Sequence, residues 1–201
     1  MALNSQGYFN SLKSYLNMAY YAVNQANDTI VLKEKIYMPD STKKKEIKVS
    51  LSFKGEAFAI KLDKKNKKGN SDPLFHFLDD NGKPWSKRCD FVAFQHYNRK
   101  IQVYCIEFKY QTLPVERVIN QLNASVAWCQ SLHSTIKNYT TKKRKLNLTK
   151  FVFSFHPDPD KYLDDAGKYL QRDHSIRHYL YDEVNGMQLE NLENTNVEEI
   201  R

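Results

Sequence analysis

Three charged side chains at the ends of two apolar segments have the types and spacing needed for metal-dependent hydrolysis. Asp90 precedes the apolar run 91–94, and Glu107 and Lys109 end a second run at 101–109. Alternate residues of a strand point to one face, so Glu107 and Lys109 are expected on the same side, about 6.5–7 Å apart along the backbone. Two carboxylates suit a hard divalent cation, and a nearby lysine can orient or help deprotonate an attacking water. The spacing therefore predicts phosphodiester hydrolysis at this strand end.

The elements that must position these residues can be read from the pattern of apolar positions. Strands are expected at 87–95 and 100–109, and the short link 96–99 makes them an antiparallel pair. The second strand is apolar on both faces, which is typical of a strand in the middle of a covered sheet. A helix at 114–137, with Pro114 in its first turn, then leads to a strand at 148–155 that should pair in parallel. The fold class is therefore predicted as α/β, with a mixed central β-sheet flanked by helices on both faces.

The remaining pattern predicts one domain over residues 1–192, with its core at about 85–155 and a frayed tail at 193–201. A helix is expected at 4–25, and alternating apolar residues at 47–53 and 57–62 predict a hairpin. A weaker helix is expected at 159–171. Asn185-Gly186, between 176–184 and 187–192, is typical of a second hairpin.

The charge balance favours a polyanionic partner. The chain has 31 Lys and Arg against 23 Asp and Glu, a net charge of +8. Basic runs often decorate solvated loops, but together they suit nucleic-acid phosphates, with DNA favoured over RNA. The residues expected to bind nucleic acid are Lys64, Lys65, Lys67, Lys68, Lys142, Lys143, Arg144 and Lys145.

The three cysteines form neither a disulfide framework nor a zinc pattern, so they are expected to be reduced core residues of a cytoplasmic protein. No apolar run is long enough to cross a membrane, and no membrane partner is expected.

A Glu-x-Lys triplet has little specificity alone, because the chain contains a second one at Glu46 and Lys48 after Asp40. That upstream set follows a polar, lysine-rich segment, whereas Glu107 ends a buried run where an unpaired carboxylate is costly. A salt bridge between Lys109 and either Glu107 or Asp90 remains the structural alternative.

The segments Arg88-Cys89-Asp90-Phe91-Val92 and Tyr104-Cys105-Ile106-Glu107-Phe108-Lys109 resemble the core of the PD-(D/E)xK, or restriction-endonuclease-like, nuclease superfamily. The resemblance covers roughly residues 85–155. Cys89 stands where the motif has proline. The first predicted helix also lacks the acidic residue that many members carry there.

The resemblance implies that Asp90, Glu107 and the backbone carbonyl of Phe108 bind Mg²⁺, with Mn²⁺ able to substitute, and that Lys109 is catalytic. Gln121 in the following helix resembles an auxiliary residue of some branches, and Glu56 is a candidate for the missing acid. The expected function is a Mg²⁺-dependent DNA endonuclease, acting as a homodimer or as a subunit of a defence, mobile-element or repair system. The alternative is an inactive nucleic-acid-binding or protein-interaction subunit of the same fold.

Overall fold

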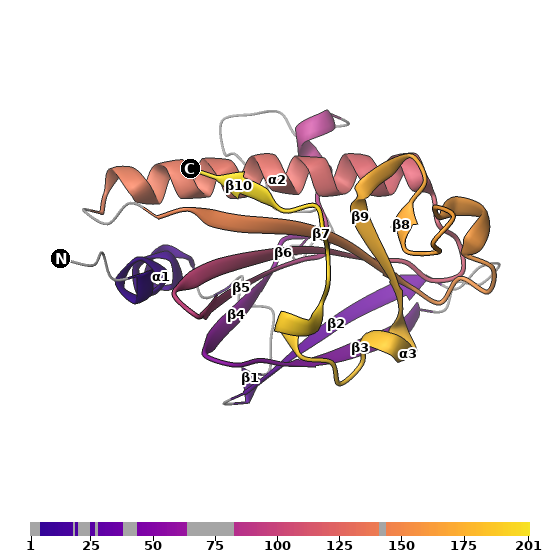
Figure 1. Cartoon of the computed structure of the whole chain (residues 1–201), viewed down its shortest axis with the longest axis horizontal. Helices are drawn as coiled ribbons and strands as arrows, with labels where there is room; N and C mark the ends of the chain where they lie inside the picture. Colours follow the sequence, from indigo (N-terminus) through magenta and orange to yellow (C-terminus); the bar gives the residue numbers. More distant parts are fainter. Residues whose placement is uncertain are drawn as a thin grey trace.

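A computed structural model describes residues 5–17, 19, 25–26, 28–37, 44–63, 83–140 and 144–201. Within these ranges the chain is an α/β protein with a mixed sheet of seven strands, a smaller sheet of three strands and three α-helices (Figure 1). No helix among the described residues is long and apolar enough to cross a membrane.

The larger sheet contains the predicted strand pair at its centre. Its strand order is β4-β5-β6-β7-β9-β8, and β10 also pairs with β7. The pairs β6–β7 and β7–β9 are parallel and the others are antiparallel, which makes the sheet mixed as the sequence predicted. The strands are β4 (Glu56–Lys61), β5 (Phe91–Tyr97), β6 (Lys100–Phe108), β7 (Leu146–Ser154), β8 (Tyr169–Leu170), β9 (Asp173–Leu180) and β10 (Glu198–Ile200).

The β5–β6 turn fixes the register that the candidate site requires. Asn98 and Arg99 both have positive φ, at 50° and 62°, which is the backbone of a tight two-residue hairpin turn. From this turn the pairing runs to Phe91 opposite Ile106. One further step along the same register places Asp90 beside Glu107.

Two helices cover one face of the larger sheet. Helix α1 (Ser5–Tyr15) contributes Tyr8, Phe9 and Leu12 to the core, and α2 (Val115–Asn138) contributes an apolar stripe. The stripe follows the predicted three-four spacing, with Val118, Leu122, Val126, Cys129 and Ile136 all buried. All three cysteines are free and buried, as expected from the sequence.

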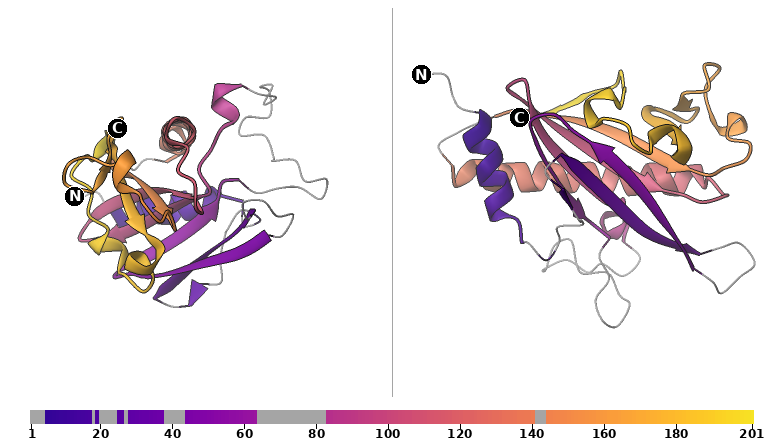
Figure 2. Two further views of the ribbon diagram at one scale, coloured as in Figure 1. Left: turned by 90° about the vertical axis from the view of Figure 1, so that its right-hand side faces the viewer. Right: turned by 90° about the horizontal axis from the view of Figure 1, so that it is seen from below.

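The opposite face is covered mainly by a second sheet, not by the helices predicted there. Strands β1 (Gln25–Ala26), β2 (Thr29–Tyr37) and β3 (Lys44–Ser52) form this sheet, and the one-turn helix α3 (Tyr181–Val184) packs beside it. In Figure 1 the larger sheet separates α2 from β2 and β3, and Figure 2 shows the same layers from two further sides.

The amino-terminal expectations were wrong in two places. The helix expected at 4–25 ends at Tyr15, and the described residues after it include β1 and β2. The expected hairpin of 47–53 with 57–62 does not form, because β3 pairs with β2 and β4 pairs with β5. Gly55 makes the transition between sheets: its φ is +74°, and an added Cβ would lie 2.3 Å from the His96 carbonyl oxygen. Period-two patterning predicts a strand but leaves its partner open.

The carboxyl-terminal expectations also need correction. The helix expected at 159–171 is only a 3-10 turn, η3 (Asp160–Tyr162), followed by β8. The second hairpin does not form, because β9 pairs in parallel with β7. After β9, Gly186, with φ of 89°, turns the chain toward β3. The tail expected to be frayed contains β10, which pairs with Leu146–Leu148 of β7.

The pairing of β10 predicts a stability contribution from the end of the chain. Ile200 is only 5% exposed, so Ile200→Ala should lower the free energy of unfolding by about 2 kcal/mol in urea titrations. Val197 is 52% exposed, and Val197→Ala should change it by less than about 0.5 kcal/mol. Equal, small effects of both substitutions would mean that β10 detaches in solution.

Candidate active site

The open end of the β5–β6 hairpin, opposite its turn, brings the two predicted carboxylates together. Asp90 accepts a hydrogen bond from the Phe108 backbone N–H through Oδ2, at 2.7 Å. Its own carbonyl accepts from Leu62 N–H at 2.9 Å, which ties the start of β5 to the end of β4. Asp90 and Glu107 are 8% and 1% exposed. Both side chains are therefore buried at the same end of the sheet.

Lys109 joins this pair and is held by helix α2. Its ammonium contacts the Glu107 carboxylate and donates to Gln121 Oε1 at 3.1 Å. The Gln121 amide donates in turn to the Arg88 carbonyl at 3.1 Å. The structure thus brings Gln121, named from the sequence as an auxiliary residue, into contact with Lys109. Three side chains and one backbone segment form a continuous polar chain.

One oxygen of Glu107 has no hydrogen-bond partner among the residues that the structure describes. The ammonium of Lys109 contacts Oε1, whereas Oε2 is buried and unpaired among the described residues. Burial raises the pKa of the Glu107 carboxyl, and the neighbouring Lys109 charge opposes that rise. An unpaired buried carboxylate oxygen is costly, so this atom is a ready acceptor for a cation or a donor group.

The Asp90 carboxyl holds a proton more strongly than an ordinary aspartate does. Burial raises its pKa well above the usual value, and the charges of Glu107 and then Glu34 raise it further. Two carboxylates that share a buried site cannot both ionise cheaply. A bound cation would reverse this preference, since it favours the ionised form of both groups.

The donor set fits a Mg²⁺ ion that keeps part of its water shell. Because the N–H and C=O of a strand residue point to the same edge, the Phe108 carbonyl points toward the Asp90 side along with its N–H. In the described part of the chain no three Asp, Glu, His or Cys side chains gather as a complete metal cage. Two carboxylates and a carbonyl are fewer ligands than Ca²⁺ or structural zinc takes, but they suit Mg²⁺, which retains several waters.

Sequence reasoning missed an acidic residue that the second sheet brings near the site. Glu34 of β2 forms an ion pair with Lys61 of β4, and its charge raises the pKa of Asp90. The signal was present in the sequence: Ile30, Leu32 and Glu34 occupy alternate positions of one strand, and the first two are fully buried. An acid that continues an apolar stripe is therefore expected to face the interior.

Two further residues influence the site from other elements. The positive charge of Arg117, in the first turn of α2, acts to lower the pKa of Glu107. Tyr181 of α3 is buried, and burial followed by the charges of Asp90 and Glu107 raises its pKa. Neither residue belongs to a recognisable sequence motif. Each reaches the site through the packing of its helix, which the sequence pattern alone does not predict.

Glu56 does not reach the site. It pairs with His96 at one end of β4, whereas Lys61, beside the site, pairs with Phe91 at the other end. The Glu56 side chain is exposed and accepts a hydrogen bond from Gln6 at 2.8 Å. A strand of six residues spans about 17 Å from first to last, so Glu56 is too distant to supply the missing acid.

The basic runs are only partly covered by the structure. Lys64, Lys65, Lys67, Lys68, Lys142 and Lys143 lie outside the described residues. Arg144 is half-buried, and Lys145 forms an ion pair with Glu199 of β10 at 2.9 Å. In the upstream set Asp40 also lies outside the described residues, while Glu46 and Lys48 form an exposed ion pair at 3.3 Å on β3.

Comparison with known proteins found no matching family model, no matching curated protein and no matching solved structure. The function must therefore be inferred from the site itself.

The raised pKa of Asp90 predicts an unusual response to its neutralisation. The unfolded carboxyl loses its proton above about pH 4, while the folded one keeps it to higher pH. The contribution of Asp90 to the stability of the metal-free protein should therefore fall as pH rises above 4. Asp90→Asn needs no proton, so in urea titrations in EDTA it should match the parent at pH 4 and have the higher free energy of unfolding at pH 8.

Asp173 provides a control, because its pKa is shifted in the opposite direction to that of Asp90. Burial acts to raise its pKa, but hydrogen bonds from Ser175 and the charge of Lys150 outweigh burial and lower it. Asp173→Asn should therefore destabilise the protein at pH 8 in the same urea titrations. If Asp90→Asn also destabilises at pH 8, Asp90 is ionised and paired in the native state, contrary to the site described above.

Proposed function

We propose that this protein is a Mg²⁺-dependent nuclease that hydrolyses phosphodiester bonds in DNA. The observation that carries the proposal is Glu107 Oε2, which is buried and has no partner in the described part of the chain, beside Asp90 and a lysine held in place by Gln121. A structural salt bridge needs one acid and one base. Here a second buried acid, Asp90, raises the cost of the arrangement, and a cation would offset that cost.

The topology around the site supports a restriction-endonuclease-like core. The PD-(D/E)xK resemblance predicts an antiparallel strand pair carrying the acids and a crossover helix that leads to a parallel strand. Strands β5 and β6, helix α2 and strand β7 have this order and these orientations. Fold analogy raises the expectation of nuclease activity, but only the side chains at the site can carry out the chemistry.

Each site residue has a defined role in the proposed reaction. Asp90, Glu107 and the Phe108 carbonyl would hold the cation, which when bound supplies Lewis-acid stabilisation of the phosphate. Lys109, fixed by Gln121, would orient the attacking water and offset the negative charge that develops on the phosphate. The ion pair with Glu107 keeps the Lys109 ammonium pointed into the site before substrate binds.

A single-metal arrangement is favoured by the position of Glu34. Its carboxylate is already paired with the ammonium of Lys61, which also lies over the Phe91 ring at 5.5 Å. A second cation would have to displace that lysine. The three acids therefore support one metal site, with Glu34 and Lys61 acting as fixed charges next to it.

The Glu107–Lys109 ion pair also supports a second candidate function, a nucleic-acid-binding module in which the charges are structural. Cleavage of supercoiled plasmid in Mg²⁺ or Mn²⁺, and its absence in EDTA, distinguishes the two candidates. Cutting of both strands would further suggest a two-fold dimer, the simplest way for a small nuclease to present two sites.

Replacement of Lys109 separates catalysis from binding. Lys109→Met keeps the aliphatic length but removes the charge that positions the nucleophile, so plasmid cleavage should fall by about 10²-fold or more. DNA affinity in EDTA at fixed salt should change by no more than about 1 kcal/mol, because a single phosphate-facing charge contributes little to the total. Lys48→Met on β3 is the matched control, since Lys48 is exposed and paired with Glu46, and it should cut at the parental rate.

Glu107→Gln should behave differently from Lys109→Met. It removes an anion that binds the metal and repels phosphate, so metal affinity should drop while metal-free DNA binding stays equal or tightens. Parental cleavage rates in both folded variants would show that the charges form only a structural salt bridge. Loss of cleavage in Lys48→Met would mean that the upstream triplet is the relevant one.

A further inference from the structure

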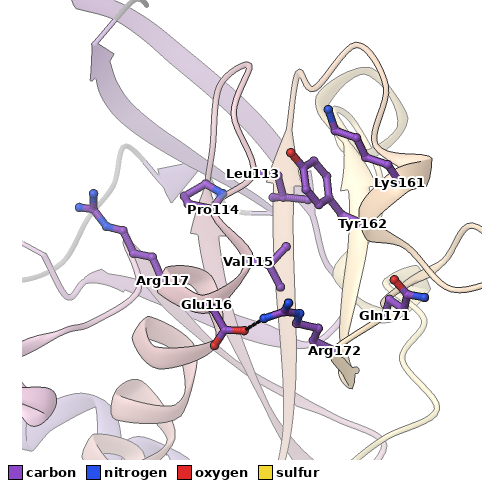
Figure 3. Close-up of a pocket in the computed structure, with 9 residues that line it drawn as sticks. All are labelled: Leu113, Pro114, Val115, Glu116, Arg117, Lys161, Tyr162, Gln171 and Arg172. Carbon is purple, nitrogen blue, oxygen red and sulfur yellow. Dashed lines mark hydrogen bonds and ion pairs between the residues drawn. The ribbon is translucent and has the colours of Figure 1, made fainter.

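A surface pocket of about 660 Å³ lies at the start of α2 (Figure 3). The walls come from three segments distant in sequence: the β6–α2 connection with the first turn of α2, the 3-10 turn η3, and the β8–β9 turn. The residues that line it are Leu113, Pro114, Val115, Glu116, Arg117, Lys161, Tyr162, Gln171 and Arg172.

The pocket combines an apolar floor with cationic walls. Figure 3 shows Leu113, Val115 and the Tyr162 ring facing the same central space. Arg172 is paired with Glu116 across the pocket. Among the described residues no carboxylate pairs with Lys161 or Arg117, and the Lys161 ammonium lies 4.9 Å from the Tyr162 ring centroid. Within the described part of the chain, Lys161 thus remains free to meet an anionic ligand at the pocket.

These features match a phosphorylated nucleoside better than a simple anion or an apolar ligand. The volume lies within the range of about 300–1,000 Å³ that is typical of small-molecule sites. An aromatic ring next to aliphatic side chains can receive a planar base, and Lys161 can receive a phosphate. Gln171 offers an amide that can donate and accept at a base edge.

The pocket adjoins the candidate active site. Leu113 is four residues after Lys109, so the two lie within about 14 Å along the backbone. Arg117 belongs to both sites: it lines the pocket, and its charge acts to lower the pKa of Glu107. In Figure 3 its side chain points away from the apolar centre of the pocket.

We propose that this pocket binds one unpaired nucleotide next to the scissile phosphate, an inference that rests on the proposed nuclease function for its neighbouring site. A base in a duplex is stacked and paired, so it cannot enter a pocket walled by Tyr162 and Leu113 without leaving the stack. The preferred substrates are therefore nucleic acids with an unpaired extension, flap or loop beside the cleavage point.

The test compares binding in EDTA to two labelled DNA hairpins, one blunt and one with a short unpaired extension, and to 5′-dAMP alone. The parent should bind the extended hairpin about tenfold more tightly than the blunt one. Lys161→Glu and Tyr162→Leu should abolish that difference. Lys168→Glu is the matched control, because Lys168 is an exposed lysine of the same region outside the pocket, and it should retain the difference.

The dAMP arm identifies the source of the nucleotide. Binding of dAMP that both pocket variants weaken, with the two hairpins bound equally, would support a site for free nucleotides and overturn its use for a strand. A hairpin preference that survives both substitutions, or no discrimination and no dAMP binding by the parent, overturns the pocket assignment. Because the readout is metal-free binding, a plasmid assay without cleavage would reject the proposed hydrolysis while leaving this result intact.

Discussion

Two carboxylates are buried at one end of the β5–β6 pair, and the contacts of the surrounding elements compensate for their burial. Removing Asp90 and Glu107 from water is costly, and the fold offsets the cost with a backbone N–H from Phe108, the ammonium of Lys109 and, for Asp90, a retained proton. The offset is incomplete, since Glu107 Oε2 has no partner among the described residues. Incomplete satisfaction of a buried polar group is typical of a functional site.

The covering elements each contribute a polar group to this strand end. Helix α2 supplies Gln121 and Arg117, and its Ser125 hydroxyl accepts from the Cys89 N–H at 2.7 Å just before Asp90. The smaller sheet supplies Glu34, and α3 supplies Tyr181. The site is therefore enclosed by three covering elements that come together only in the folded chain. That arrangement explains why a change at one charge is expected to alter the pKa values of several others.

The sequence predicted the parts of the fold whose signals are local. The β5–β6 pair, the stripe of α2 and the parallel β6–β7 pairing follow from alternation, helical spacing and a short turn. The partners of β3 and β9 were wrong, because an alternating strand fits any free sheet edge and the choice depends on burial elsewhere. The helix expected at 4–25 failed for a similar reason, since spacing alone did not mark its end at Tyr15.

In the candidate site, too, the residues marked by local sequence signals were predicted and those brought in by distant packing were not. Asp90, Glu107 and Lys109 could be grouped from the sequence because two adjacent strands carry them, and Gln121 because a helix follows directly. Glu34 was missed because β2 reaches the site only through the packing of the two sheets. Glu56 was included because strand patterning does not tell which end of β4 lies near the first residue of β5. The pairing register shows that this end is Lys61 and not Glu56.

The metal site can be tested in a crystal soaked in Mn²⁺ by locating the anomalous scattering of the ion. We expect one strong Mn²⁺ peak per chain, bound by Glu107 Oε2, an Asp90 oxygen and the Phe108 carbonyl, and lost in Glu107→Gln. A crystal without manganese at this position, in which Glu107 Oε2 is instead bonded to a protein donor, would contradict the metal site and with it the proposed chemistry.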